Sequence, residues 1–285
     1  MENILEIKKL SKTYSGFSLK DIDLNIPKGS IVGLIGENGA GKSTTIKLIL
    51  NQIKKSSGEI KIFGKDNITD EKEIKKDIGA VLDSAFLSEY LTVEDINKIM
   101  KNFYENWSED KFFKDVEKAS LPRKKLLKEF STGMKMKVQI ITALAHDPKL
   151  LILDEPTNGL DPVARNELLD IFREFIQDEE KSILISSHIT TDLEHIADYI
   201  VFIHSGSILL SMAKDELLEN YALVKCKEKE FANIDSLDYV RYIKNAYGYD
   251  LLVQNKREFK KKYSSLVIDK VSIEDIMLLY VKGEK

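Results

Sequence analysis

The sequence predicts an α/β protein with a mostly parallel central sheet, an antiparallel β layer before it, a helical insertion and a small C-terminal α+β appendix. Three observations support this prediction. Short apolar runs bounded by turn residues alternate with segments of helical period. A glycine-rich turn directly follows one of these runs. Between Ser88 and His146 the period is helical and no strand pattern is convincing.

The predicted strands differ in character along the chain. Those expected in the parallel sheet are almost entirely apolar, which is typical of strands covered on both faces. They are Ile31–Ile35, Leu150–Leu153, Ile183–Ser186 and Ile200–Ile203. The N-terminal strands are expected to form the antiparallel layer, and they are Ile4–Leu10, Leu19–Leu24 and Ile60–Phe63.

Helical patterns occupy the intervals between these strands. In the insertion, Thr92 and Asp95 have the spacing of a capping box. The apolar residues expected on one face of the helix that follows are Ile96, Ile99, Phe103 and Trp107. The helix expected after the glycine-rich turn carries Ile46, Ile49, Leu50 and Ile53 at helical spacing, and a final helix is predicted over Ser272–Val281.

The alternation of strands and helices weakens from about Lys214. We therefore expect a main domain over residues 1–213 and a small accessory domain over residues 214–285. Within the main domain, the helical subdomain is expected over about 88–147.

Composition narrows the class of protein. The 285 residues carry a formal net charge of −4, which argues against nucleic acid as the main partner, because phosphate binding usually requires a basic face. The single cysteine, Cys226, allows no internal disulfide, which fits a reducing cytoplasm. No signal-peptide pattern is found, and no run approaches the ~18 apolar residues that span a bilayer. A membrane function would therefore require a separate membrane-spanning chain.

The glycine-rich turn predicts binding of a nucleoside triphosphate. Its position between a predicted strand and a predicted helix is the context in which a phosphate-binding P-loop occurs. Glycines let backbone N–H groups converge on phosphate oxygens, and the helix N-terminus adds its dipole. Lys42 would pair with the β- and γ-phosphates, and Ser43 would offer its hydroxyl to Mg²⁺. The predicted nucleotide-binding residues of the turn are Gly36, Glu37, Asn38, Gly39, Ala40, Gly41, Lys42, Ser43 and Thr44.

A second nucleotide signal is the apolar strand Leu150–Leu153, which runs directly into Asp154 and Glu155. In a P-loop fold the first carboxylate lies on the Mg²⁺ side and the second can reach the attacking water. Asp154 is therefore predicted as a metal-side residue and Glu155 as the general base. The sequence thus implies a nucleoside triphosphate and Mg²⁺ as cofactors.

The segment Asp154–Pro162, DEPTNGLDP, together with Ser186-Ser187-His188 and the P-loop, resembles the ATP-binding cassette (ABC) ATPases over residues 1 to about 210. This resemblance implies a P-loop NTPase core, ATP as the nucleotide, and two cassettes that hold two ATP molecules between them. Each ATP would contact one subunit's P-loop and the other subunit's signature segment. The family signature is usually Leu-Ser-Gly-Gly-Gln, and here the matching residues are Phe130-Ser131-Thr132-Gly133-Met134.

The resemblance also assigns roles to single residues. Ser131, Thr132 and Gly133 would face the nucleotide of the second subunit, although Thr132 and Met134 depart from the usual signature. Asp161 would reach across the same interface, and it also precedes Pro162 as a helix N-cap would. The histidine expected to contact the γ-phosphate and to position Glu155 is His188, and Tyr14 is expected to stack on adenine.

One departure concerns the metal. The family usually ends the strand around Ile78–Leu82 with a glutamine that touches Mg²⁺, and here Asp83 takes that place. We expect the Asp83 carboxylate to strengthen the dependence of hydrolysis on Mg²⁺.

The resemblance also implies that the segment after Asp83 would accept a short cytoplasmic helix of a membrane permease, with Phe86, Leu87 and Tyr90 as candidate contacts. The alternative is that these side chains pack only against their own helical subdomain.

The family's soluble translation factors carry two cassettes, whereas this chain carries one. The family's chromosome and repair ATPases need a long coiled coil between the nucleotide motifs, whereas here only about 110 residues without heptads separate Lys42 from Asp154. This favours an ATP-hydrolysing transport subunit, with a second ATPase subunit and an integral membrane permease as partners. It would be cytoplasmic and peripheral on the cytoplasmic face of the plasma membrane. The signature, Asp83 and the C-terminal tail look most like subunits of bacterial exporters of drugs or antimicrobial peptides. The alternative hypothesis is a nucleotide-gated regulatory or sensing module that drives no transport.

Overall fold

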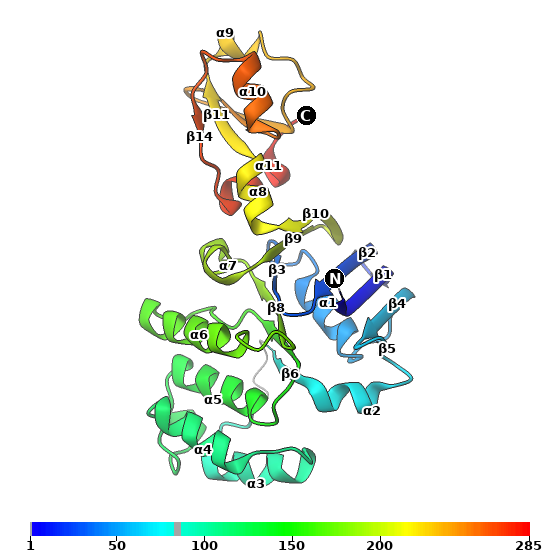
Figure 1. Ribbon diagram of the computed structural model, residues 1–285, viewed down its shortest axis with the longest axis vertical. Helices are drawn as coiled ribbons and strands as arrows, with labels where there is room; N and C mark the ends of the chain where they lie inside the picture. The colour runs from blue at the N-terminus through cyan, green and yellow to red at the C-terminus, as the bar shows by residue number, and fades with distance from the viewer. Residues whose placement is uncertain (1, 83–86) are drawn as a thin grey trace.

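The computed structural model describes residues 2–82 and 87–285. Along the long axis of the molecule, the helical insertion lies at one end, the first two sheets lie in the middle and the C-terminal segment with the third sheet lies at the other end (Figure 1). The described strands form three sheets, one of six strands and two of four strands. The P-loop NTPase core, the antiparallel layer, the helical subdomain and the C-terminal α+β appendix are confirmed.

The central sheet has the strand order β10-β9-β3-β8-β7-β6. Its strands from β9 to β6 are parallel to their neighbours, and β10 pairs with β9 in the antiparallel sense. Every predicted parallel strand is present, and the bounds are β3 (Ile31–Ile35), β6 (Ile78–Val81), β7 (Leu150–Asp154), β8 (Ser182–Ser187), β9 (Tyr199–His204) and β10 (Ser207–Ala213). The side chains of β3, β7 and β8 are buried throughout, as the apolar runs predict.

The N-terminal strands form an antiparallel sheet of order β2-β1-β4-β5, which lies beside the central sheet (Figure 1). Their bounds are β1 (Asn3–Tyr14), β2 (Phe17–Pro27), β4 (Ser57–Ile62) and β5 (Lys65–Asp66). Helix α1 (Lys42–Ile49) packs between the two sheets, where Ile46 and Ile49 join the apolar core. The prediction that this helix includes Ile53 is wrong, because Asn51 adopts a left-handed conformation (φ 53°) just past the helix end.

A short α-helix, α2 (Glu71–Ile74), and a 3-10 helix, η1 (Lys75–Asp77), precede β6, and the helical insertion follows that strand. Its bounds are α3 (Val93–Phe103), α4 (Glu109–Lys118), η2 (Leu127–Glu129) and α5 (Thr132–Leu144), and it has its own apolar core. The predicted capping box is present: Thr92 Oγ1 accepts from the Asp95 N–H at 3.1 Å, and the Asp95 carboxylate accepts from the Thr92 N–H at 3.2 Å.

The predicted apolar face of α3 needs correction. The helix buries Val93, Ile96 and Met100, whereas Ile99 is 37% exposed and Phe103 is 77% exposed. Trp107 lies beyond the helix end and reaches the same core from a turn, where its Nε1–H donates to Asn97 Oδ1 at 2.9 Å. The buried face of α3 is therefore rotated about the helix axis relative to the predicted face.

The remaining helices of the main body are α6 (Pro162–Phe175) and α7 (Thr190–Ile196). The chain then continues through α8 (Lys214–Asn220) into a third sheet of order β12-β13-β11-β14. The bounds in this part are β11 (Ala222–Cys226), α9 (Glu228–Phe231), β12 (Arg241–Asn245), β13 (Gly248–Val253), α10 (Lys256–Lys262), β14 (Ile268–Asp269) and α11 (Ile273–Lys282).

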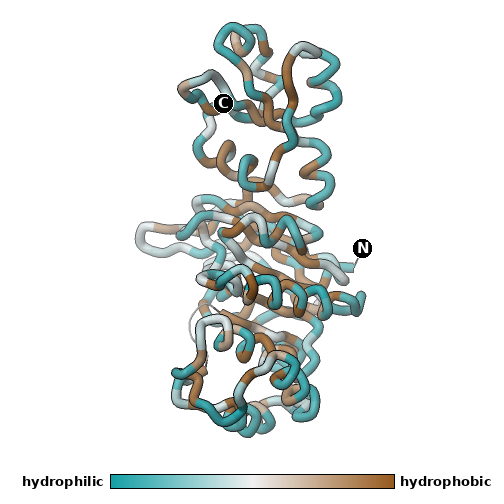
Figure 2. The backbone as a smooth tube through the Cα atoms, turned by 90° about the vertical axis from the view of Figure 1, so that its left-hand side faces the viewer, coloured by the Kyte–Doolittle hydropathy of each residue, from teal (hydrophilic) through white to brown (hydrophobic). Residues whose placement is uncertain are grey.

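The C-terminal segment shares a core with the central sheet. Ile276 and Leu279 of α11 belong to the same buried apolar cluster as Leu193 and Ile196 of α7. The first amide of α11 is tied to the same helix, because the Ile273 N–H donates to Glu194 Oε1 at 2.7 Å. The hydropathy view shows hydrophobic segments continuing through the middle of the molecule, while hydrophilic segments outline the outer helices (Figure 2).

This shared core predicts that two positions on α11 respond differently to truncation. Ile276 is 2% exposed, so Ile276→Ala is expected to lower the free energy of unfolding by about 2–5 kcal/mol through lost burial and a cavity. Leu278 is 45% exposed on the same helix, and Leu278→Ala is expected to change it by less than ~1 kcal/mol. Urea unfolding followed by circular dichroism measures both, and equal losses would contradict the shared core.

Candidate functional site

The site lies at the carboxyl ends of three neighbouring parallel strands. Strand β8 lies between β3 and β7, and the register places Ser186 opposite both Leu34 and Asp154. Because all three strands point the same way, the P-loop after β3, the carboxylates after β7 and His188 after β8 meet at one edge. Segments that are more than 100 residues apart in the sequence are thus brought together.

The P-loop backbone requires glycine at both of its ends. A Cβ on Gly36 would lie 2.3 Å from the carbonyl oxygen of Ile203, so no side chain fits there. Gly41 has φ 118°, which only glycine adopts readily, and it precedes the first residue of α1. Gly41 offers no side-chain cap to that helix, so the first amides of α1 are available to an anion.

Lys42 is only 5% exposed, and its ammonium is directed to three acceptors. Nζ donates to the carbonyl oxygens of Gly36 at 2.7 Å and Glu37 at 3.2 Å, and it lies 3.1 Å from Oε1 of Glu155. The ammonium thus makes two hydrogen bonds to the loop and one ion pair with Glu155. The buried positive charge is therefore neutralised by Glu155 and solvated by the loop itself.

Glu155 reaches Lys42 through an unusual backbone conformation. Its φ is 53°, a left-handed value that costs a residue with a side chain about 1–2 kcal/mol. The same carboxylate binds the segment after β8, because Oε2 accepts from the His188 N–H at 3.2 Å and lies 2.7 Å from His188 Nδ1. One carboxylate thus joins two of the residues predicted to be catalytic.

Asp154 is the last residue of β7 and is 3% exposed. Its Oδ1 accepts a hydrogen bond from Ser186 Oγ at 2.6 Å. Within the described ranges, no three His, Cys, Asp or Glu side chains gather as a metal cage. The Asp154 carboxylate and the Ser43 hydroxyl of the P-loop are however hard-oxygen donors of the kind with which proteins bind Mg²⁺ alongside substrate phosphates. The residues present therefore fit a nucleotide-bound Mg²⁺.

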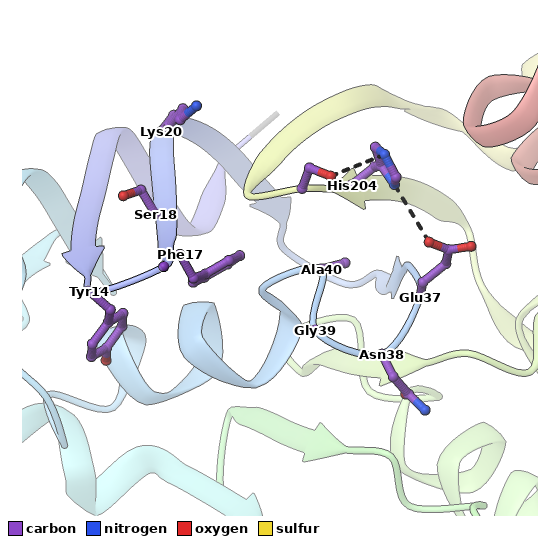
Figure 3. Close-up of a pocket in the computed structure, with 11 residues that line it drawn as sticks. Tyr14, Phe17, Ser18, Lys20, Glu37, Asn38, Gly39, Ala40 and His204 are labelled. Atoms are coloured by element: carbon purple, nitrogen blue, oxygen red, sulfur yellow. Dashed lines mark hydrogen bonds and ion pairs between the residues drawn. The ribbon is translucent and has the colours of Figure 1, made fainter.

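A cavity of about 520 Å³ lies beside the P-loop, between the first β hairpin and the hairpin that joins β9 to β10 (Figure 3). It is lined by Tyr14, which ends β1 and is 43% exposed, and by residues 37–40 of the P-loop. On the opposite side lies His204, whose Nδ1 is 3.9 Å from Glu37 Oε2. The structure therefore places Tyr14 and the P-loop around one cavity.

The signature residues begin a helix in another part of the chain. Ser131 caps α5, since its Oγ accepts from the Met134 N–H at 3.2 Å. Gly133 lies against α6, where a Cβ would come within 3.1 Å of Ala164 Cβ. Among the described residues, no recorded hydrogen bond or ion pair joins residues 131–133 to residues 36–44. Within the described part of one chain, the signature segment therefore makes no polar contact with the P-loop.

Asp161 is the N-cap of α6, as its position before Pro162 predicts. Its Oδ1 accepts from the N–H groups of Val163 and Ala164, both at 3.0 Å. The hydrogen bonds from Ala164 and then Val163 lower the pKa of Asp161 below its ordinary value, because they stabilise the charged carboxylate. Asp161 is therefore anionic at neutral pH.

Two of the predicted contacts, Asp83 and Phe86, lie outside the described residues. Of the others in that segment, Leu87 is 8% exposed and packs into the core of the helical insertion, as the alternative reading of this segment has it. Tyr90 is 75% exposed, with the Lys128 ammonium 5.6 Å from its ring centre.

Sequence reasoning assigned no individual role to two residues of this region, Ser186 and His204. Ser186 is two residues before His188, and the sequence marks it only as the end of an apolar strand and as part of the Ser186-Ser187-His188 segment that resembles the family. Its significance depends on the register between β7 and β8, which one sequence does not reveal. His204 follows the predicted strand Ile200–Ile203 directly, and its place at a strand end was the available signal.

The part of the chain that the structure describes contains no helix with the length and apolar character needed to cross a membrane.

Comparisons with known proteins show the family to which the chain belongs. The family model described as ABC transporter matches residues 19–158. SrtF of Streptococcus pyogenes, a lantibiotic transport ATP-binding protein, is 39% identical over 215 residues, which are 74% of this chain and 92% of that protein. BcrA of Bacillus licheniformis, a bacitracin transport ATP-binding protein, is 36% identical over 221 residues, which are 76% of this chain and 72% of that protein.

A solved structure of an ATP binding subunit of an ABC transporter is 31% identical to this chain. It superposes with a TM-score of 0.69 and covers 76% of this chain and 92% of its own. The similarity favours the transport ATPase over the regulatory module. The chain belongs to the ABC transporter family, as an ATP-binding subunit that hydrolyses ATP.

Proposed function

We propose that this subunit powers a bacterial exporter of antimicrobial peptides or similar amphiphiles, together with a second ATPase subunit and a separate membrane permease. The observation that carries the proposal is the convergence of Lys42, Glu155 and His188 at one sheet edge, with Asp154 beside them. The substrate class rests on the names of SrtF and BcrA, which are lantibiotic and bacitracin transport proteins.

The proposed chemistry is attack of a water molecule on the γ-phosphate of ATP. Glu155 takes the proton of that water, and His188 holds the Glu155 carboxylate through Nδ1 and its backbone N–H. Lys42 and the first amides of α1 stabilise the charge that develops on the phosphate oxygens. Because Glu155 is paired with Lys42, the phosphate of bound ATP would compete for the ammonium and release the carboxylate to act as base.

Mg²⁺ is proposed to be held by Ser43 and by Asp154, whose carboxylate is fixed by Ser186. When bound, the ion neutralises the phosphates and polarises the bond that breaks. Asp83 remains a proposed third metal-side residue on the basis of its place in the sequence.

We propose a head-to-tail pair of ATPase subunits. The support is that, in the described residues, Ser131, Thr132 and Gly133 lie at the start of α5 without a hydrogen bond or ion pair to the P-loop of their own chain. A hydroxyl and backbone amides at a helix N-terminus suit an anion, so the signature of one subunit would complete the site of the other. Asp161, which caps α6, is proposed to lie at the same interface.

A groove of about 1250 Å³ between η1 and α3 is the proposed permease contact. Its apolar lining includes Leu87, Leu91, Ile99 and Phe103, and the exposure of the last two is otherwise unfavourable in water. An amphipathic helix of the permease would cover this surface. The subunit would in this way be held at the cytoplasmic face of the plasma membrane.

The division into residues 1–213 and 214–285 is likewise proposed. In support, the third sheet has an apolar cluster of its own, which includes Val224, Leu251 and Phe259. We propose that the accessory part acts on the ATPase through α11 and α7, which share the central core.

Replacement of Glu155 tests the assignment of the general base. Glu155→Gln is expected to lower kcat for ATP hydrolysis by about 10²–10⁴-fold, because glutamine cannot accept the proton, while the Kd for ATP stays within a few-fold. Glu180→Gln is the matched control, since it removes a carboxylate from an exposed ion pair with Lys28. An unchanged rate in Glu155→Gln would show that another group is the base.

Replacement of Tyr14 tests the adenine contact. Loss of stacking in Tyr14→Ala is expected to raise the Kd for ATP by about 5- to 100-fold, the range that one aromatic–base contact provides. Tyr14→Phe keeps the ring and is expected to bind ATP within about twofold of the original protein. Competition against a fluorescent nucleotide measures both values. Equal affinity in all three proteins would place adenine elsewhere.

The transport assignment is tested by gentle solubilisation of native membranes and affinity capture of the tagged subunit. A polytopic membrane protein in stoichiometric amount is the expected companion. The same capture from Phe103→Asp, a charge placed in the proposed groove, is expected to lose that companion while ATP binding persists. Recovery of the original protein only from the soluble fraction would contradict the proposed association with a permease.

A further inference from the structure

Ser186 occupies a position at which the two halves of the nucleotide site meet. It lies on β8 between β3 and β7, opposite Leu34 on one side and Asp154 on the other. The residue is fully buried, with 0% of its surface exposed. The three residues before it in β8, residues 183–185, are apolar and buried. A hydroxyl buried at the end of such a strand needs hydrogen-bond partners.

The partners of Ser186 are the two consecutive acidic residues. Its Oγ–H donates to Asp154 Oδ1 at 2.6 Å, and the same oxygen accepts from the Glu155 N–H at 3.0 Å. The Glu155 N–H also lies 3.2 Å from the Ser186 carbonyl oxygen. One small side chain therefore binds the carboxylate of one acidic residue and the backbone of the next.

Each of these bonds has a separate physical effect. The Asp154 carboxylate is 3% exposed, and a buried carboxylate needs donors to keep one orientation. Glu155 has the left-handed φ of 53°, which surrounding contacts must hold in place. The hydrogen bond to its N–H restrains this turn, and the turn directs the Glu155 carboxylate to Lys42 and His188.

We propose that Ser186 is a positioning residue for ATP hydrolysis, which sets the orientation of the Asp154 carboxylate and holds the backbone turn of Glu155. It would act through these two residues and would not touch the nucleotide. The inference rests on the proposed roles of Asp154 and Glu155, and it adds to them a residue that aligns the metal side and the base side of the site with one another.

The same strand provides a matched control. Ser182 at the other end of β8 is also 0% exposed, and its Oγ accepts from the Gly29 N–H at 3.1 Å. Ser182→Ala removes a buried, hydrogen-bonded hydroxyl from the same strand away from the site. A purely structural effect of losing a buried serine would appear equally in Ser182→Ala and Ser186→Ala.

The test compares Ser186→Ala, Ser186→Thr and Ser182→Ala. Ser186→Ala is expected to lower kcat by about 10- to 100-fold, to raise the Mg²⁺ concentration needed for half-maximal rate, and to leave KM for ATP within about threefold. Ser186→Thr retains the hydroxyl and is expected to recover most of the rate. Ser182→Ala is expected to stay within about twofold of the original kcat. Its thermal midpoint is expected to change by about as much as that of Ser186→Ala.

A second readout needs neither nucleotide nor metal. Amide hydrogen exchange of the peptide that contains Glu155 is expected to accelerate in Ser186→Ala and not in Ser182→Ala, because only the first loses an acceptor of the Glu155 N–H. Equal kcat and equal exchange in the two alanine variants would overturn the proposal. If Glu155→Gln leaves hydrolysis unchanged, the assigned base is wrong, and the exchange experiment alone decides whether Ser186 holds the turn.

Discussion

The buried ammonium of Lys42 is the constraint on which the arrangement of the site depends. Because Lys42 is only 5% exposed, its ammonium is largely shielded from water, and the carbonyl oxygens of Gly36 and Glu37 solvate it instead. A carboxylate must also balance its charge. Glu155 supplies that carboxylate from another strand. The P-loop, the carboxylate strand and, through Glu155, the His188 segment are therefore held together by one charge.

This electrostatic requirement explains why local strain is tolerated. Glu155 adopts a left-handed backbone conformation that is unfavourable for a residue with a side chain, and this turn directs its carboxylate to Lys42 and His188. The buried strands β3, β7 and β8 hold the surrounding backbone in place, so the strained turn at Glu155 can persist.

The C-terminal segment is more closely joined to the ATPase core than a separate appendix would be. Helix α11 packs on α7, which begins two residues after His188, and the ring of Tyr280 lies 6.2 Å from that of Phe202 on β9. Changes in the position of the third sheet can therefore be transmitted to the nucleotide site through packed side chains. This gives the proposed accessory role a physical route, with α11 as its connecting element.

The sequence by itself determined the features that are local in the chain. The apolar runs, the glycine-rich turn, the capping box at Thr92 and the N-cap at Asp161 each depend on residues a few positions apart, and all are present in the structure. The tertiary structure alone decided which residues meet across strands: Glu155 with Lys42, Ser186 with Asp154, and α11 with α7. It also corrected the buried face of α3, since Ile99 and Phe103 are exposed at a groove. The physical reason is that periodicity indicates that an element has an apolar side, whereas the residues buried on that side, the strand order, the register and a left-handed turn are set by contacts between distant segments.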